Sequence, residues 1–336
     1  MTNLLRRRAG VTNAGFTIVE LLVVISIIGV LVGLLLPALG GVQRRSKKAD
    51  EISRIRQVGV AWNLYANANQ DRALPGWLED DVQSRWRVSY RFPDDKVIPD
   101  ADSEEWSWRL MPYLDHDQET LMGHLNLPET SKVALSNYAP SEYDPAFVYP
   151  PPRPQRPALA RARHIAQEPG FGYNAMYVGG WWEMVDVEGE ELPRHRFYNA
   201  RELNPSDPDA DGRINPVALT PGSIRDSSRF ILFCSTAGQS MGSHHEVKDI
   251  WPGSHYAVPP IVADSRIWET ASADSIIDVV QLLDSFSSPI PVGRFTGQAA
   301  VLHADLHSEP WAPGDLDDQR YWINLADNET WKHRPE

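Results

Sequence analysis

The sequence predicts an α+β protein in which one long N-terminal helix is followed by a domain of short strands and turns. An uncharged apolar run at residues 21–39, and a helical spacing of apolar residues beyond it, predict the helix. Short apolar runs bounded by polar or glycine-rich turns, at residues 173–178 and 229–234, predict strands. A chain of 336 residues with 42% hydrophobic residues can bury a sizeable core in one large or two small domains.

The apolar run has the length of a membrane span. Residues 21–39 are 19 residues with one hydroxyl, that of Ser26. As a helix rising about 1.5 Å per residue, they match the hydrocarbon core of a bilayer. A secretory signal is the alternative, but its apolar region is about 7–15 residues long and ends at a small-residue cleavage site. We therefore expect a transmembrane helix over residues 16–41.

The charge is distributed unevenly along the chain. The net charge is −13, yet residues 1–48 carry seven Lys or Arg against one acid, which leaves −19 for residues 49–336. A domain this acidic is a poor nucleic-acid binder and is better suited to divalent cations. Cys234 is the only cysteine, so no intrachain disulfide can form. We expect it to be a buried thiol in a core strand.

Glu20 lies at the start of the apolar run, where a carboxylate carried to mid-bilayer costs on the order of a few kcal/mol. An interfacial position is the plainest explanation. However, Glu20 comes four residues after Phe16, which follows Gly15 and a short leader with three arginines. The segment GFTIVE, with Pro37 further along, resembles the processing site of type IV prepilins and type II secretion pseudopilins.

This resemblance implies how the protein is processed and with what it assembles. A prepilin peptidase would remove residues 1–15 by cutting between Gly15 and Phe16, and would methylate the new amine of Phe16. Glu20 would pair with the amino terminus of a neighbouring subunit during assembly. The implied partners are that peptidase, other pilin or pseudopilin subunits and the inner-membrane assembly platform.

The resemblance also implies location and fold. Basic residues flank the apolar run on both sides, so charge alone leaves its orientation open. A pilin-like protein would be a single-pass inner-membrane protein with a cytoplasmic N-terminus and a periplasmic or extracytoplasmic C-terminal domain. Residues 42–70 would continue the helix as a stalk that packs on an antiparallel sheet. The exported domain, residues 71–336, would carry loop-rich insertions, including a proline-rich one at 139–157.

The stalk has a clear helical pattern. Its apolar residues recur at three- and four-residue intervals: Ile52, Ile55, Val58, Trp62 and Tyr65. Gly59 is a mild cost within it. Residues 69–71 and the following Pro75-Gly76 are expected to end it.

Further segments resemble a narrower group, the large pseudopilin-like proteins abundant in planctomycete-type bacteria. They are RQVGVA at 56–61, WRLMPYL at 108–114, Gly172-Tyr173-Asn174, and AVLHAD at 300–305. The chain departs from that group at two points. It has Tyr149-Pro150 where a Cys-Pro pair is frequent, and Asp305-Leu306 where an Asp-Gly pair is frequent.

A calcium loop is the best candidate for a small-ligand site. Asp207, Asp209, Asp211 and Gly212 match positions 1, 3, 5 and 6 of a calcium loop, and Asn215 is a further candidate ligand. Ala218 stands at position 12, where an EF-hand has a bidentate glutamate. A polar surface turn rich in Asp and Gly is therefore an equally good interpretation.

Two histidine groups are weaker candidates for a transition metal. His303, Asp305 and His307 alternate, so a continuous strand would present them on one face. The alternative is the solvated face of the last strand of a pilin sheet. His244, His245, Glu246 and His255 lack a helical His pair, and we expect a histidine-bearing loop.

Other segments carry structural expectations. Four tryptophans within residues 74–138 indicate a small core rather than a carbohydrate-binding surface: Trp77, Trp86, Trp106 and Trp108. Residues 275–283 are expected to form a short amphipathic helix, and residues 311–331 an irregular acidic tail.

Two functions of different class follow. The first is a structural subunit of a type II secretion pseudopilus or a type IV pilus-like filament. The second is a membrane-anchored exported enzyme or ligand-binding domain that uses the same leader and depends on a metal. No Ser/His/Asp set stands out in the sequence, so we expect a structural subunit and not an enzyme.

Overall fold

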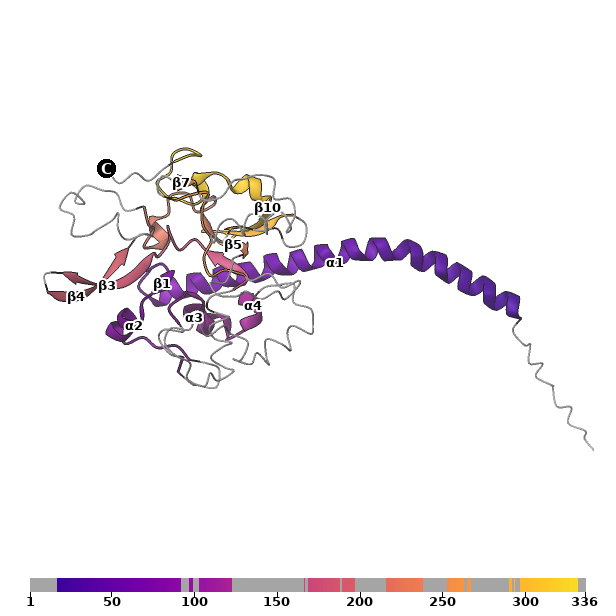
Figure 1. Ribbon diagram of the computed structural model, residues 1–336, viewed down its shortest axis with the longest axis horizontal. Coiled ribbons are helices and arrows are strands. Elements are labelled where there is room, and N and C mark those ends of the chain that lie inside the picture. Colours follow the sequence, from indigo (N-terminus) through magenta and orange to yellow (C-terminus); the bar gives the residue numbers. More distant parts are fainter. Residues whose placement is uncertain are drawn as a thin grey trace, which may run out of the picture. The chain divides into compact units, whose positions relative to one another are not determined.

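The computed structural model describes residues 17–91, 97–98, 103–122, 166, 169–187, 189–196, 216–237, 253–262, 265–266, 290–291, 293 and 297–331. The chain divides into two compact units, Met1–Ser46 and Lys47–Glu336. Helix α1 (Ile18–Ala68) contributes its first part to the first unit and the remainder to the second (Figure 1). The fold is α+β, with antiparallel sheets in the second unit.

The first unit is helical over its described residues. The large apolar side chains of α1 from Ile18 to Leu34 are exposed. Among the described side chains, which omit residues 35–39 of the apolar run, no helix is long and apolar enough to cross a membrane. The span expected over residues 16–41 is thus not found within the described part of the chain.

In the second unit, α1 buries the apolar face that the sequence predicts. Ile55, Val58 and Trp62 are almost fully buried, and Ile52 and Tyr65 are half-buried against the same core. The helix ends at Ala68, and Gln70 and Asp71 follow with left-handed φ angles of 59° and 62°. Residues 69–71 therefore end the helix, as the turn-forming composition indicates.

The main sheet is antiparallel and has five strands among the described residues. Its order is β10 (Ser308–Trp311), β9 (Ala299–His303), β5 (Ile231–Ala237) and β2 (Phe171–Tyr173), and β8 (Ile290–Pro291) pairs with β5. On β9, Ala300 and Leu302 belong to the core that includes α1, whereas Ala299 and Val301 belong to a second core with Trp322. Both faces of the central strands are therefore buried.

Gly59 is located where α1 packs closely against Leu302 of β9. A Cβ atom at this position would lie 2.6 Å from Cδ2 of Leu302. Glycine weakens a helix interior by roughly 0.5–1 kcal/mol relative to alanine. The close packing of helix on sheet explains why a residue with this cost occupies the middle of the stalk.

Smaller elements complete the second unit. A three-stranded sheet joins β1 (Trp77–Leu78), β3 (Trp181–Val187) and β4 (Glu190–Arg196), with β1 parallel to β3 and β3 antiparallel to β4. Strands β6 (Ile261–Val262) and β7 (Ser265–Arg266) pair with each other. The short helices are α2 (Asp80–Trp86), α3 (Ser107–Leu110), η2 (Met111–Leu114), α4 (Gln118–Met122), η6 (Pro221–Ser223), η7 (Pro313–Leu316) and η8 (Gln319–Tyr321).

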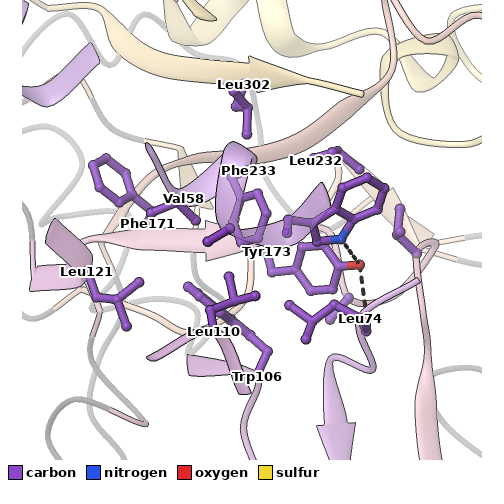
Figure 2. Packing of buried hydrophobic residues seen from close by; sticks show 14 of the residues in the cluster. Val58, Leu74, Trp106, Leu110, Leu121, Phe171, Tyr173, Leu232, Phe233 and Leu302 are labelled. Atoms are coloured by element: carbon purple, nitrogen blue, oxygen red, sulfur yellow. Dashed lines mark hydrogen bonds between the residues drawn. The ribbon is translucent and has the colours of Figure 1, made fainter. Parts of the chain in front are cut away.

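Tyr173 is at the centre of the core between α1 and the sheet (Figure 2). Its hydroxyl accepts a hydrogen bond from Trp62 Nε1 at 3.1 Å and donates one to the Leu74 carbonyl at 3.0 Å. Its ring stacks on Phe233 with centroids 4.7 Å apart. One side chain thus links α1, the segment after α1, and β5.

The expectation of a tryptophan-anchored core is confirmed for two of the four tryptophans. Trp106 and Trp108 are 0% and 1% exposed, and Trp106 packs edge-on against Phe233. In contrast, Trp86 is 37% exposed and contacts Trp182 edge-on at 5.2 Å. A surface pair of aromatic rings therefore forms on α2 and β3.

One local expectation is wrong, and another is incomplete. Residues 173–178 do not form one strand, because the chain turns after Tyr173 and the Val178 amide donates to the Asn174 carbonyl at 2.9 Å. Residues 312–331 are irregular apart from short 3-10 turns, as expected, but they are packed: Trp311 ends β10, and Trp322 is fully buried with its indole donating to the Leu316 carbonyl. Burial of these aromatic rings outweighs the acidic composition of the segment.

Candidate functional site

Two places in the described structure gather chemically active side chains: the turn between β9 and β10, and the start of α1. At the first, His303 ends β9 and the chain reverses, so that the His303 amide donates to the His307 carbonyl at 3.0 Å. The Leu306 amide donates to the His303 carbonyl at 2.9 Å, and Leu306 has a left-handed φ of 70°. This is a three-residue hairpin turn with a left-handed third residue, a position that favours glycine.

The turn brings three side chains together: His303, His307 and Glu309. We call them the two-histidine cluster. One ligand atom from each lies within 4.8 Å of the others. Glu309 Oε1 is 3.6 Å from His303 Nε2 and 3.5 Å from His307 Nε2. The two imidazole rings stack nearly parallel, with centroids 4.1 Å apart.

The cluster differs from the set predicted by strict alternation. His303 and His307 are brought together, but by folding back across a turn and not by lying along one strand. Asp305 lies in the turn, where its Oδ1 is 2.5 Å from His307 Nδ1. Glu309, which the sequence analysis missed, is the third member. The spacing His303, turn, His307, Glu309 is the signal for it, because paired hairpin strands place these residues on one face.

The alternative interpretation, a solvated face on the last strand, does not hold for His303. His303 is 0% exposed, and the Arg229 backbone, its hydrogen-bonding neighbour, can satisfy only one of its two ring nitrogens. Its ring lies 5.3 Å from that of Trp311, on the side of the sheet where Trp322 is buried. The C-terminal segment therefore covers this end of the sheet.

The buried imidazole is held neutral at physiological pH. Burial, with a smaller contribution from the charge of His307, lowers the pKa of His303 to about 4. Interactions with the Arg229 backbone, Glu309 and Asp305 act in the opposite direction but are outweighed. A neutral imidazole has a lone pair on one ring nitrogen, which is the form that binds metals.

This shift predicts that acid destabilises the second unit. The unfolded chain protonates His303 near pH 6.5, whereas the folded chain resists protonation down to pH 4, so the free energy of unfolding falls between those values. The free energy of unfolding is expected to fall by about 2 kcal/mol from pH 7 to pH 5. Denaturant unfolding of the full chain in mild detergent with a chelator measures it.

The matched variant is His303→Gln, which lacks this titration. Glu104 titrates in the opposite sense, because burial and the neighbouring Glu105 and Asp80 raise its pKa to about 7. Its contribution is present in both chains and cancels in the comparison. The same dependence on pH in wild type and His303→Gln would contradict the prediction.

The calcium-loop residues and most of the second histidine group lie outside the described residues. Asp207, Asp209, Asp211 and Asn215 lie outside the described residues, so calcium binding there stays a prediction. The same holds for residues 244–246 of the second histidine group, for the proline-rich segment 139–157 and for the expected helix at 275–283. His255 is described: its carbonyl accepts hydrogen bonds from the Tyr173 amide and from Trp106 Nε1.

The second place of interest is the start of α1, where Thr17 and Glu20 form a reciprocal cap. The Glu20 amide donates to Thr17 Oγ1 at 3.2 Å, and Glu20 Oε2 accepts from the Thr17 amide at 2.8 Å. This is a capping box, in which a threonine and a glutamate three residues later satisfy two otherwise unpaired amides. The sequence signal, T-x-x-E before an apolar run, was present and was missed.

Comparison with known families identifies the segment around this cap. Residues 6–36 match the family model described as the prokaryotic N-terminal methylation motif. The chain carries a prepilin-type methylation motif. Comparisons with curated proteins and with solved structures found no match. Residues 37–336 are thus not assigned to a family, and the resemblance to the narrower pseudopilin-like group stays a prediction.

The methylation motif contains Gly15, Phe16 and Glu20. Gly15 and Phe16 lie outside the described residues, so the structure does not describe the predicted cleavage site. Glu20 is described, and its carboxylate accepts hydrogen bonds from the backbone amide and the hydroxyl of Thr17. The glutamate therefore has a local role in starting α1, whatever it contacts in an assembly.

Proposed function

We propose that this chain is a pilin-like structural subunit of a type II secretion pseudopilus or a type IV pilus-like filament. The observation that carries the proposal is the methylation motif at residues 6–36, which leads directly into a long helix. In this proposal a prepilin peptidase removes residues 1–15 and methylates Phe16. The subunit then remains anchored in the inner membrane, with its acidic domain exported, until the assembly platform extracts it.

The described part of α1 supports a role in assembly. From Ile18 to Leu34 its large apolar side chains are exposed. An exposed apolar surface of this extent marks contact with lipid or with other proteins. Neighbouring copies of the same helix in a filament would bury it. The second part of α1 is fixed in its own domain by Ile55, Val58 and Trp62, which leaves the first part to make those contacts.

Replacement of Glu20 tests the assembly role and separates it from capping. Glu20→Gln keeps an oxygen that can accept from the Thr17 amide, but it loses the charge that would pair with a neighbour's amino terminus. Breaking a buried ion pair costs about 3–5 kcal/mol. We expect Glu20→Gln and Glu20→Ala both to reduce the amount of chain in the sheared filament fraction by more than about tenfold.

Thr17→Val is the control for this experiment. It removes the hydroxyl half of the capping box, which weakens the helix start by about 1 kcal/mol, but it keeps the carboxylate. We expect it to enter filaments normally. Mass spectrometry must show that every variant begins at Phe16, so that a failure of processing is not mistaken for a failure of assembly. Normal assembly of Glu20→Gln would show that Glu20 acts only as a cap.

The second candidate function, an exported enzyme or ligand-binding domain with the same leader, is favoured by one observation. The two-histidine cluster, in the second unit, could hold a metal ion. Imidazole and carboxylate groups bind such ions directly, so the cluster supports ligand binding more than catalysis. Calcium at Asp207, Asp209, Asp211 and Asn215 remains a separate proposal, for which thermal melting with calcium and with chelator is the test.

A further inference from the structure

We propose that His303, His307 and Glu309 form a binding site for one divalent transition-metal ion of the zinc class. Two imidazole nitrogens and one carboxylate oxygen would be the protein ligands, and water would complete a tetrahedral shell. This inference is independent of the proposed role in filaments, because it rests on the β9–β10 turn and not on α1.

The distances in the cluster suit such an ion. In a tetrahedral zinc site with bonds of about 2.0–2.2 Å, two ligand atoms are separated by about 3.4 Å. Glu309 Oε1 lies 3.5 Å from His307 Nε2 and 3.6 Å from His303 Nε2. These separations are too long for hydrogen bonds but match those of two atoms that share a metal ion.

A buried ring nitrogen of His303 without a hydrogen-bond partner indicates a bound ligand. Its side chain is fully buried, and the Arg229 backbone can satisfy only one of its two ring nitrogens. A buried polar nitrogen without a partner is costly. A proton shared between His307 and the two nearby carboxylates would satisfy those three groups, but it would leave the second nitrogen of His303 without a partner. A metal ion bound to Nε2 of His303 satisfies the buried ring as well.

Neighbouring groups orient the other two ligands. Asp305 Oδ1 lies 2.5 Å from His307 Nδ1, which places the proton on Nδ1 and leaves the lone pair of Nε2 directed at Glu309. Trp311 Nε1 donates to Glu309 Oε1 at 2.7 Å. Metal-binding histidines and carboxylates commonly have such supporting hydrogen bonds. Asp305 and Trp311 are therefore positioning residues for the ion.

Binding requires one local movement. The lone pairs of His303 and His307 lie in nearly parallel ring planes, with centroids 4.1 Å apart, so one ring must tilt for both nitrogens to point at the same ion. His307 is able to do so, because its side chain is 41% exposed. Glu309 is 46% exposed, so the ion and its water reach the site from solvent. Two imidazole ligands favour zinc-class metals over calcium and magnesium, which prefer oxygen.

Titration of the full chain with Zn²⁺ tests this inference. The chain is purified in detergent without a histidine tag, treated with a chelator and dialysed before calorimetry. We expect saturable binding of one zinc ion per chain at this site. Glu309→Gln and His307→Gln change exposed side chains and so leave the fold intact; they should weaken binding more than tenfold, and Asp305→Asn about tenfold. Co²⁺ should give the visible absorption of a tetrahedral site.

Matched controls decide between this site and adventitious binding. His116→Gln and Glu329→Gln remove one histidine and one exposed glutamate outside the cluster and should bind zinc as wild type does. Ca²⁺ and Mg²⁺ in excess should not compete. The proposal is overturned if zinc binding is not saturable, if His307→Gln and Glu309→Gln bind as tightly as the controls, or if calcium displaces zinc.

Discussion

Gly179→Ala is expected to destabilise the second unit by about 3–5 kcal/mol, which is exceptional for the addition of one methyl group. Gly179 has a left-handed φ of 68°, and a Cβ atom there would lie 1.8 Å from the carbonyl oxygen of Leu74. That oxygen cannot move aside easily, because it accepts the hydroxyl of the central Tyr173 at 3.0 Å. The Gly179 amide is itself fixed by a hydrogen bond to the Ala218 carbonyl.

Gly189→Ala is the matched control. Gly189 also has a positive φ, 86°, but a Cβ atom there would meet nothing within 4 Å. In this variant the only expected loss of stability is that caused by backbone strain, about 1 kcal/mol. The difference between the two variants in denaturant unfolding therefore measures the contact with Leu74. An equal loss in both would show that the chain does not pack closely at Gly179.

The parts of the fold that depend on local periodicity were predictable. The spacing of Ile55, Val58 and Trp62 identifies the buried face of α1, and the same residues are buried in the structure. The apolar run around Phe233 predicts a buried strand, and β5 is the centre of the main sheet. Such patterns depend only on one helix or strand and on the layer it packs against. They can therefore be recognised without knowledge of the tertiary fold.

The parts that depend on contacts between distant segments were not predictable. From the sequence alone, Gly59 only weakens the helix. Its contact with Leu302 of β9 explains why a residue without a side chain is needed there. From the sequence alone, Trp322 belongs to an acidic tail. In the structure it is buried against the second apolar face of the sheet. Leu302 is 243 residues after Gly59, and Ile231, in the core that buries Trp322, is 91 residues before it. Local composition carries no information about partners this distant.

The candidate metal site lies between these two cases. Strict alternation grouped His303, Asp305 and His307, and it failed because Leu306 adopts a left-handed conformation and reverses the chain. An Asp-Gly pair would have signalled the turn, but leucine occupies the glycine position. Alternation therefore includes both histidines of the two-histidine cluster but not Glu309, which only a hairpin places beside them.

Asn174→Asp is expected to lower the free energy of unfolding by about 3–5 kcal/mol at neutral pH, although the two side chains have the same shape. Asn174 is fully buried, and its Nδ2 donates to the Ile231 carbonyl at 3.0 Å and to the Trp322 carbonyl at 2.8 Å. One side chain thus ties the β2 turn to β5 and to the C-terminal segment. An aspartate would bury a negative charge against two carbonyl oxygens and would donate to neither.

The loss should shrink as the pH falls, because a protonated carboxyl group donates one hydrogen bond and carries no charge. Denaturant unfolding at pH 7 and pH 5 measures both effects. Asn67→Asp is the control: Asn67 is exposed and donates only to Asn63 Oδ1, so a change within about 0.5 kcal/mol is expected. If Asn174→Asp is no less stable than Asn67→Asp, the amide of Asn174 does not hold the C-terminal segment against the sheet. In that case the burial of Trp322, and the closed end of the sheet around His303, would need another cause.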